Sequence, residues 1–133
     1  MKQFLLFVLA LPLGLFAQNF EDPYAVVVPV QTQLDAYNTG NLELFLSAYS
    51  DTVKIYAFPN TLRYQGKDKM RERYGNMFEK QPDLQCRLVS RTVMGDRVVD
   101  HESVYRTKDR APNEVIAIYR VEDGLIQEVW FMR

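Results

Sequence analysis

The chain has 133 residues, of which 47% are hydrophobic and 13% aromatic, and its formal net charge is −1. A near-neutral chain with interspersed charges lacks the positive footprint of a nucleic-acid-binding protein, so we expect no nucleic-acid partner. A single cysteine, Cys86, excludes an internal disulfide, and a single histidine, His101, excludes the ligand spacing of a zinc site. We therefore expect neither a metal nor another cofactor.

The first residues have the layout of a secretory signal peptide. A short positive start at 1–3 precedes an apolar run of 13 residues, 4 through 16, and Ala17 follows. A membrane span needs roughly 20 apolar residues, so this run is too short to cross a bilayer. We predict a signal peptide over 1–17 and a single domain over 18–133; the alternative is an uncleaved N-terminal anchor. The protein is then exported to the periplasm or the medium, with no membrane attachment after cleavage.

Three helices and one strand are predicted in the first part of the domain. Val26, Val30 and Leu34 recur at helical spacing behind Asp22-Pro23, a pair that can cap and start a helix. Further along, the pattern predicts a second helix at 42–49, a strand at 53–58, and a third helix that begins at 66 and ends before 82.

After residue 82 the hydrophobic period changes from 3.6 to 2. The alternation predicts four strands, at 84–94, 97–108, 114–122 and 125–132, with hairpin turns at 95–96 and 123–124. Helices followed by consecutive strands indicate an α+β fold, in which about three helices wrap one face of a curved antiparallel sheet. Such a fold encloses a concave, mostly apolar cavity, the usual place for a small ligand.

The strand around the only histidine contains the best single candidate for chemistry. Successive side chains of a strand point to opposite faces, so Val99, His101 and Ser103 share one face, and Asp100 and Glu102 share the other. If the first face is the inner one, a residue type that titrates near neutrality lies inside the fold. His101 is then a candidate catalytic residue. The alternative is a core histidine bonded to a tyrosine hydroxyl.

Two stretches, Tyr-Asn-Thr-Gly-Asn-Leu-Glu-Leu-Phe-Leu at 37–46 and Tyr-Ser-Asp-Thr-Val at 49–53, resemble the opening of the NTF2-like superfamily. Within it the chain is most similar to SnoaL-like and ketosteroid-isomerase-like proteins. Further matching stretches lie at 58–60, 64–66, 71–74, 99–102 and 117–126. The resemblance covers about 26–133 and implies a cone-shaped NTF2-like (cystatin-like) fold. It does not define the function, because this superfamily holds isomerases, cyclases, epoxide hydrolases, ligand binders and dimerisation modules.

The resemblance argues against a steroid isomerase mechanism. That chemistry uses a carboxylate base, a protonated carboxylic acid and a tyrosine. By the resemblance these groups would fall at Ala57, Ala117 and Gln33. Alanine neither takes a proton nor donates a hydrogen bond, so the two carboxyl groups are missing. Their loss implies a wider and more apolar cavity.

The resemblance, together with strand parity and helical spacing, predicts which residues face this cavity. At helical spacing, residues such as Tyr37, Tyr74 and Phe78 are more often packing residues of the core, which is the alternative to ligand contact. Besides His101, the predicted ligand-contacting residues are Gln33, Tyr37, Ile55, Ala57, Tyr74, Phe78, Val99, Ser103, Val115, Ala117, Tyr119, Val129 and Phe131.

Three functions remain open from the sequence. The first is an exported binder of a small, mostly apolar molecule that bears a carbonyl or hydroxyl group. The second is a cofactor-free isomerase or lyase that acts on a steroid- or polyketide-like compound through His101. The third is a non-catalytic dimerisation module. Trp130, Ile118 and Met132 would give the outer face of the sheet an apolar patch, which predicts a homodimer.

Overall fold

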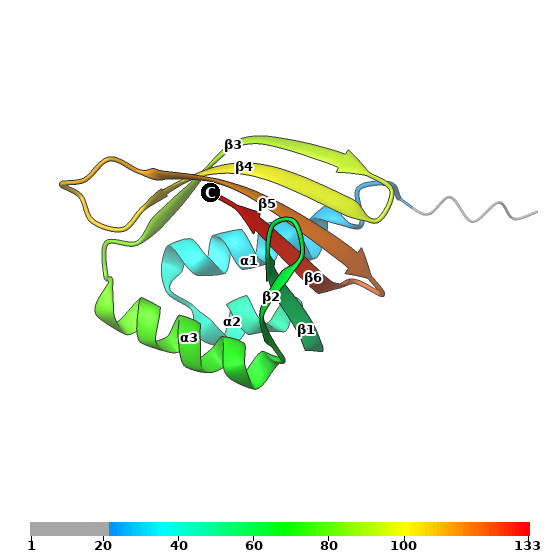
Figure 1. The fold of residues 1–133 in the computed structure, drawn as a ribbon, viewed down its shortest axis with the longest axis horizontal. Helices are drawn as coiled ribbons and strands as arrows, with labels where there is room; N and C mark the ends of the chain where they lie inside the picture. Colours follow the sequence, from blue (N-terminus) through cyan, green and yellow to red (C-terminus); the bar gives the residue numbers. More distant parts are fainter. Residues whose placement is uncertain (1–21) are drawn as a thin grey trace, which may run out of the picture.

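The computed structural model describes residues 22–133, and the predicted signal peptide lies outside them. Three helices lie on one side of a six-stranded curved sheet (Figure 1). The helices are α1 (Val27–Thr39), α2 (Leu42–Ser47) and α3 (Lys67–Lys80). The strands are β1 (Tyr49–Ala57), β2 (Thr61–Gln65), β3 (Gln85–Met94), β4 (Arg97–Tyr105), β5 (Asn113–Glu122) and β6 (Leu125–Met132). The predicted α+β fold with a curved, helix-covered sheet is confirmed.

The strand order is β2-β1-β6-β5-β4-β3. Strands β3 to β6 form consecutive antiparallel hairpins, whereas β1 runs parallel to β6. The sequence pattern missed β2, which lies at the edge of the sheet and whose residues are mostly exposed. An edge strand with no buried face has no apolar alternation by which a sequence could reveal it.

Local sequence explains the ends of the main elements. Gly40 ends α1 with φ 65°, a left-handed conformation that glycine adopts without strain. Asn41 starts α2 by accepting a hydrogen bond from the backbone N–H of Leu44 at 3.1 Å. Pro29 lies in the first turn of α1, where its missing N–H removes no helical hydrogen bond. The helix thus begins at Val27, later than the Asp22-Pro23 start that the sequence suggested.

The core fills the space between the helices and the inner face of the sheet. Aromatic rings form its helical side, with the centroids of Phe45 and Tyr74 4.3 Å apart and those of Tyr37 and Phe78 5.7 Å apart. Val53, Val98 and Val129 are fully buried on the sheet side. The cavity lies at the end of the sheet where β4 and β6 finish and β5 begins, and the rings of Tyr37 and Tyr74 form part of its wall.

Candidate functional site

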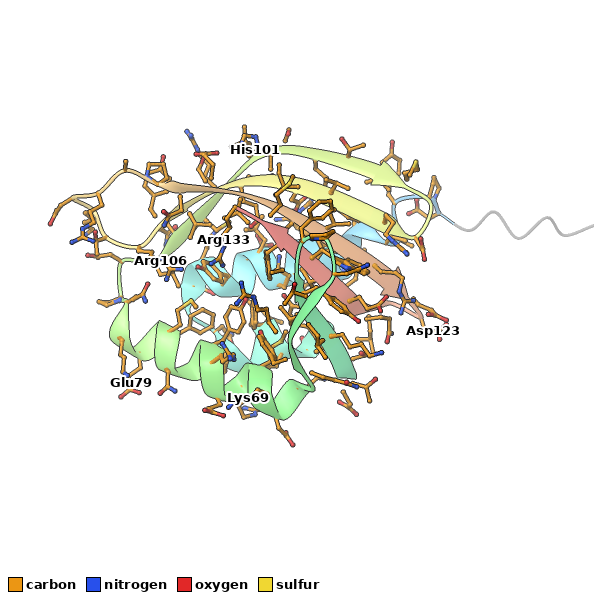
Figure 2. All side chains as sticks on the ribbon, in the orientation of Figure 1. Lys69, Glu79, His101, Arg106, Asp123 and Arg133 are labelled. Carbon is orange, nitrogen blue, oxygen red and sulfur yellow. The ribbon has the colours of Figure 1, made fainter. Side chains whose placement is uncertain are left out.

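The prediction that His101 lies inside the fold is wrong. In β4 the side chains of Val98, Asp100 and Glu102 point inward, whereas His101 lies on the side of the sheet away from the helices (Figure 2). Its Nε2 lies 2.5 Å from a carboxylate oxygen of Glu114 on the neighbouring strand. Val99 and Ser103 share this outer face, so they too do not face the cavity.

The pairing of β4 with β5 explains the inversion. Asp100 lies opposite Ala117 and Glu102 opposite Val115, and directly opposed residues of antiparallel strands share a face. Because Val115 and Ala117 are buried and inward, both carboxylates point inward as well. The sequence analysis placed the acidic side chains of β4 outside and the face that carries His101 inside. A shift of one residue in a strand exchanges the faces of all its side chains.

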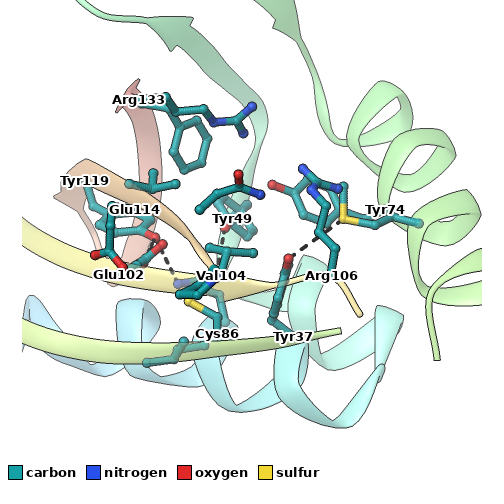
Figure 3. Close-up of a pocket in the computed structure, with 17 residues that line it drawn as sticks. Tyr37, Tyr49, Tyr74, Cys86, Glu102, Val104, Arg106, Glu114, Tyr119 and Arg133 are labelled. Carbon is teal, nitrogen blue, oxygen red and sulfur yellow. Dashed lines mark hydrogen bonds between the residues drawn. The ribbon is translucent and has the colours of Figure 1, made fainter. Parts of the chain in front are cut away.

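The inner ends of β4, β5 and β6, with α1 and α3, enclose a cavity of about 570 Å³ (Figure 3). Six of the predicted residues line it: Gln33, Tyr37, Tyr74, Val115, Tyr119 and Phe131. Sequence reasoning missed several others, and the most relevant of these for chemistry are Tyr49, Glu102, Arg106 and Arg133.

The remaining predicted residues lie elsewhere on the inner side. Ile55 and Ala57 line an adjoining cavity of about 450 Å³, which shares Tyr74 and Phe131 with the first. Phe78 packs against the core, and Ala117 and Val129 are fully buried within it. These last three residues have structural positions in the core and line neither cavity.

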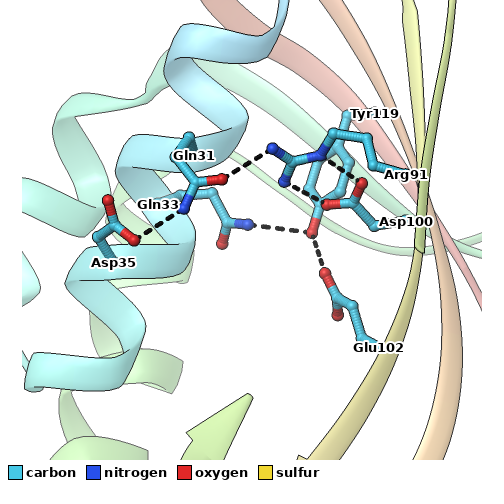
Figure 4. Close-up of polar contacts among 7 residues, drawn as sticks. All are labelled: Gln31, Gln33, Asp35, Arg91, Asp100, Glu102 and Tyr119. Carbon is cyan, nitrogen blue, oxygen red and sulfur yellow. Dashed lines mark hydrogen bonds and ion pairs between the residues drawn. The ribbon is translucent and has the colours of Figure 1, made fainter. Parts of the chain in front are cut away.

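A chain of hydrogen bonds ends on the carboxylate of Glu102. The Tyr49 hydroxyl donates to Gln33 Oε1 at 3.2 Å, and Gln33 Nε2 donates to the Tyr119 hydroxyl at 3.1 Å. The Tyr119 hydroxyl in turn donates to Glu102 Oε1 at 3.0 Å (Figure 4). These donors fix one oxygen of Glu102 from α1, β1 and β5, which are rigid parts of the fold.

The protonation of Glu102 is unusual for a carboxyl group. Burial raises its pKa from 4.5 to about 7, because a carboxylate loses its hydration inside the fold. The hydrogen bond from Tyr119 lowers the pKa, and the neighbouring charge of Asp100 raises it again. A carboxyl group that is half protonated near neutrality can both accept and donate a proton, which makes Glu102 the strongest acid–base candidate in the cavity.

The second inward carboxylate has a different environment. Asp100 accepts two hydrogen bonds from the guanidinium of Arg91, both at 2.7 Å, and its side chain has no exposed surface. Arg91 also donates to Gln31 Oε1 at 2.8 Å, and Gln31 Nε2 donates to Asp35 at 2.8 Å (Figure 4). This pair holds α1 against β3 and β4, outside the cavity lining. Asp100 is therefore structural, whereas Glu102 has no ion-pair partner within 4.0 Å among residues 22–133.

The cavity shows no arrangement for metal or thiol chemistry. No group of three His, Cys, Asp or Glu residues within 22–133 is placed to hold a metal ion. Cys86 lines the cavity, but burial raises the pKa of its thiol and so keeps it protonated and weakly nucleophilic. In the same range of residues no helix is long and apolar enough to cross a bilayer.

Comparison with known proteins agrees with this architecture. The family model of the SnoaL-like domain matches residues 30–129, and the chain belongs to that family. An uncharacterized cystatin-fold protein of Novosphingobium aromaticivorans superposes with a TM-score of 0.74 at 21% identity, over 81% of this chain and 97% of that one. A SnoaL-like protein of unknown function from Burkholderia thailandensis gives 0.70 at 16% identity, over 84% and 95%.

An LEH-like epoxide hydrolase of M. tuberculosis also shares the fold, with a TM-score of 0.66 at 14% identity over 80% of both chains. The search of curated proteins finds no match. At these identities the likeness concerns the fold alone, because one fold carries many reactions. The function must therefore be argued from the cavity and its side chains.

Proposed function

We propose that the protein binds a small, mostly apolar molecule that bears a carbonyl or hydroxyl oxygen. The supporting observation is the cavity of about 570 Å³, a size typical of small-molecule sites. Leu34, Val104 and Phe131 give it apolar walls, while Glu102 places a carboxyl group in the same lining. Apolar walls bind a ligand through burial, and the polar side chains between them select it through its oxygen atoms.

A cavity-filling substitution tests this proposal. The neutral dye N-phenyl-1-naphthylamine brightens when it leaves water for an apolar site, and we expect saturable binding to the wild type. Val104→Trp places a ring in the cavity and should weaken binding at least about tenfold, whereas Val89→Trp, at an exposed position of β3, should leave it unchanged. Equal binding by both variants, or none by the wild type, would contradict the proposal.

The raised pKa of Glu102 favours a second candidate, a cofactor-free proton-transfer enzyme of the isomerase or lyase type. In this form of the hypothesis Glu102 replaces His101 as the acid or base. Glu102 lies opposite Val115, two residues along β5 from Ala117, the position that lacks the family carboxylic acid. Its carboxylate would take a proton beside a carbonyl and return it to another carbon, while the Tyr49–Gln33–Tyr119 chain holds the carboxylate in place.

Enone isomerisation with two matched variants tests the catalytic form. Glu102→Gln keeps the shape but cannot exchange a proton, and it should lower the rate about 10²- to 10⁴-fold, the usual contribution of acid–base catalysis. His101→Ala, on the outer face, should retain the wild-type rate. The wild-type pH profile should show an inflection near 7, the pKa of Glu102. A rate insensitive to Glu102→Gln would exclude this residue as the proton carrier.

The outer face of the sheet supports the proposed homodimer. Trp130 stacks on Tyr56 with ring centroids 5.3 Å apart, and it lies opposite Ile118 on β5. Met132 lies opposite Ile116 on the same face and is 43% exposed. We propose that this face binds a second copy, with or without ligand binding. In analytical ultracentrifugation the wild type should then sediment as a dimer and Ile118→Arg as a monomer. A wild type that sediments as a monomer would contradict the proposal.

Export is proposed on the sequence of residues 1–17 alone. We expect the secreted protein to begin at or near Gln18, a prediction that N-terminal sequencing of protein recovered from the periplasm or medium can check. Recovery of a chain that begins at Met1 from the cytoplasm would contradict it.

A further inference from the structure

The side of the cavity away from Glu102 is positively charged. Arg106 follows the last residue of β4 and Arg133 follows the last residue of β6, so the two ends of these strands bring both arginines to the cavity. Figure 2 shows both side chains between the sheet and α3, and Figure 3 shows both among the residues that line the cavity. Both guanidinium charges act to lower the pKa of Tyr37, which burial raises, so their field reaches the cavity wall.

Neither arginine is neutralised by the protein. Within residues 22–133 no carboxylate oxygen lies within 4.0 Å of either guanidinium, whereas Arg91 and Arg120 each pair with an acid. In the described part of the chain, the only side-chain hydrogen bond from Arg106 goes to the neutral Gln81, at 3.4 Å. Arg133 lies over the ring of Phe131, with its guanidinium carbon 5.9 Å from the centroid. Both groups therefore keep unused donors beside an apolar space.

The adjoining cavity extends this positive region. It shares Tyr74, Phe131 and Arg133 with the first cavity and adds Arg63 and Arg73, and no acidic side chain of residues 22–133 lines it. In the first cavity Glu114 is already occupied, because its two oxygens contact Ser103 and His101. Among residues 22–133, none of the four arginines that line the two cavities has a carboxylate oxygen within 4.0 Å.

From this juxtaposition we propose that the ligand is a small carboxylic acid, with its carboxylate held by Arg106 and Arg133 and its apolar body directed towards Glu102. The inference rests on the proposed binding function and names the class of its ligand. A guanidinium presents parallel N–H donors that match the two oxygens of a carboxylate. A single negative charge fits this cavity better than a phosphate monoester does, because Glu102 shares the space and repels a second charge.

The test compares an acid with its matched amide. We expect 2-naphthoate to displace the neutral dye N-phenyl-1-naphthylamine at concentrations about tenfold lower than 2-naphthamide, which has the same shape without the charge. In the double variant Arg106→Gln/Arg133→Gln this ratio should fall to about one, with each displacement referred to the Kd of the neutral dye measured on that same variant. The control Arg110→Gln, in the exposed loop after β4, should keep the wild-type ratio.

The outcomes separate the two levels of the proposal. Dye binding with equal displacement by acid and amide, or a ratio that survives in the double variant, would overturn the carboxylate inference and leave the binding function standing. Absent dye binding would contradict the binding function. Calorimetry with 2-naphthoate alone then decides the carboxylate inference, which is overturned if the wild type gives no heat of binding or if the double variant binds equally well.

Discussion

Glu102→Gln is expected to stabilise the folded protein by about 3 kcal/mol at pH 8. The pKa of Glu102 is raised from 4.5 to about 7 on folding, chiefly through burial. Below pH 4.5 the carboxyl is protonated in both states. Between pH 4.5 and 7 the unfolded chain releases a proton that the folded state retains, so stability falls as the pH rises, and above 7 the loss is complete. Glutamine carries no charge and avoids this loss.

Urea unfolding at several pH values measures this effect. The stability difference between Glu102→Gln and the wild type should be largest at pH 8 and should become small near pH 4.5. Glu79→Gln, at an exposed position of α3, should behave like the wild type at every pH. A Glu102→Gln variant that is no more stable than the wild type at pH 8 would contradict the assignment of Glu102 as a costly buried charge.

Asp100→Asn is expected to destabilise the protein by about 3 kcal/mol or more, since it leaves the Arg91 guanidinium without its acid. The Asp100 side chain is fully buried and that of Arg91 is 13% exposed, so water cannot replace the lost partner. The double variant Arg91→Met/Asp100→Leu removes both charges and should recover a large part of the loss, because an apolar pair needs no such compensation.

Chemical denaturation of the two variants is the measurement. A double variant as unstable as Asp100→Asn would show that the hydrogen bonds themselves, and not the unpaired charge, carry the stability. An Asp100→Asn variant with wild-type stability would contradict the buried ion pair. Gln31 accepts a hydrogen bond from Arg91 but carries no charge. Gln31→Leu should therefore lower the folding stability by less than Asp100→Asn does.

The order of elements could be predicted because most segments carry one clear pattern. The hairpin turns at 95–96 and 123–124 are signalled by Gly95 and by Asp123-Gly124, and both appear in the structure as expected. The inner face of β5 was predictable as well, since Val115, Ala117 and Tyr119 alternate with more exposed residues. Gln33 and Tyr119 were accordingly found as cavity residues.

The face of β4 could not be predicted from its own residues. Asp100 and Glu102 resemble surface residues, yet each is compensated inside the fold by a group from another strand, Arg91 and Tyr119 respectively. The loop at 106–112 is too long to fix the register of β4 against β5. One signal was present. The tight turn at 95–96 places Arg91 directly opposite Asp100, so the sequence already pairs this acid with a base across the hairpin.

The arginines of the cavity were missed for a related reason. Arg106 lies in the strand predicted at 97–108, on the face of Asp100 and Glu102 that the sequence reading placed outside, and Arg133 lies just beyond the end of β6. Their meeting depends on β4 and β6 finishing at the same end of the sheet, which is a property of the three-dimensional arrangement. A sequence shows such residues only as scattered surface charges.

The central claim is that the cavity beside Glu102, and not the face that carries His101, is where a small molecule binds. Intermolecular nuclear Overhauser effects between N-phenyl-1-naphthylamine and the methyl groups of the protein test it most directly. The account predicts contacts to the methyl groups of Leu34, Val104 and Val115, which line the cavity. Contacts confined to Val99 and Ile118, on the outer face, would contradict it.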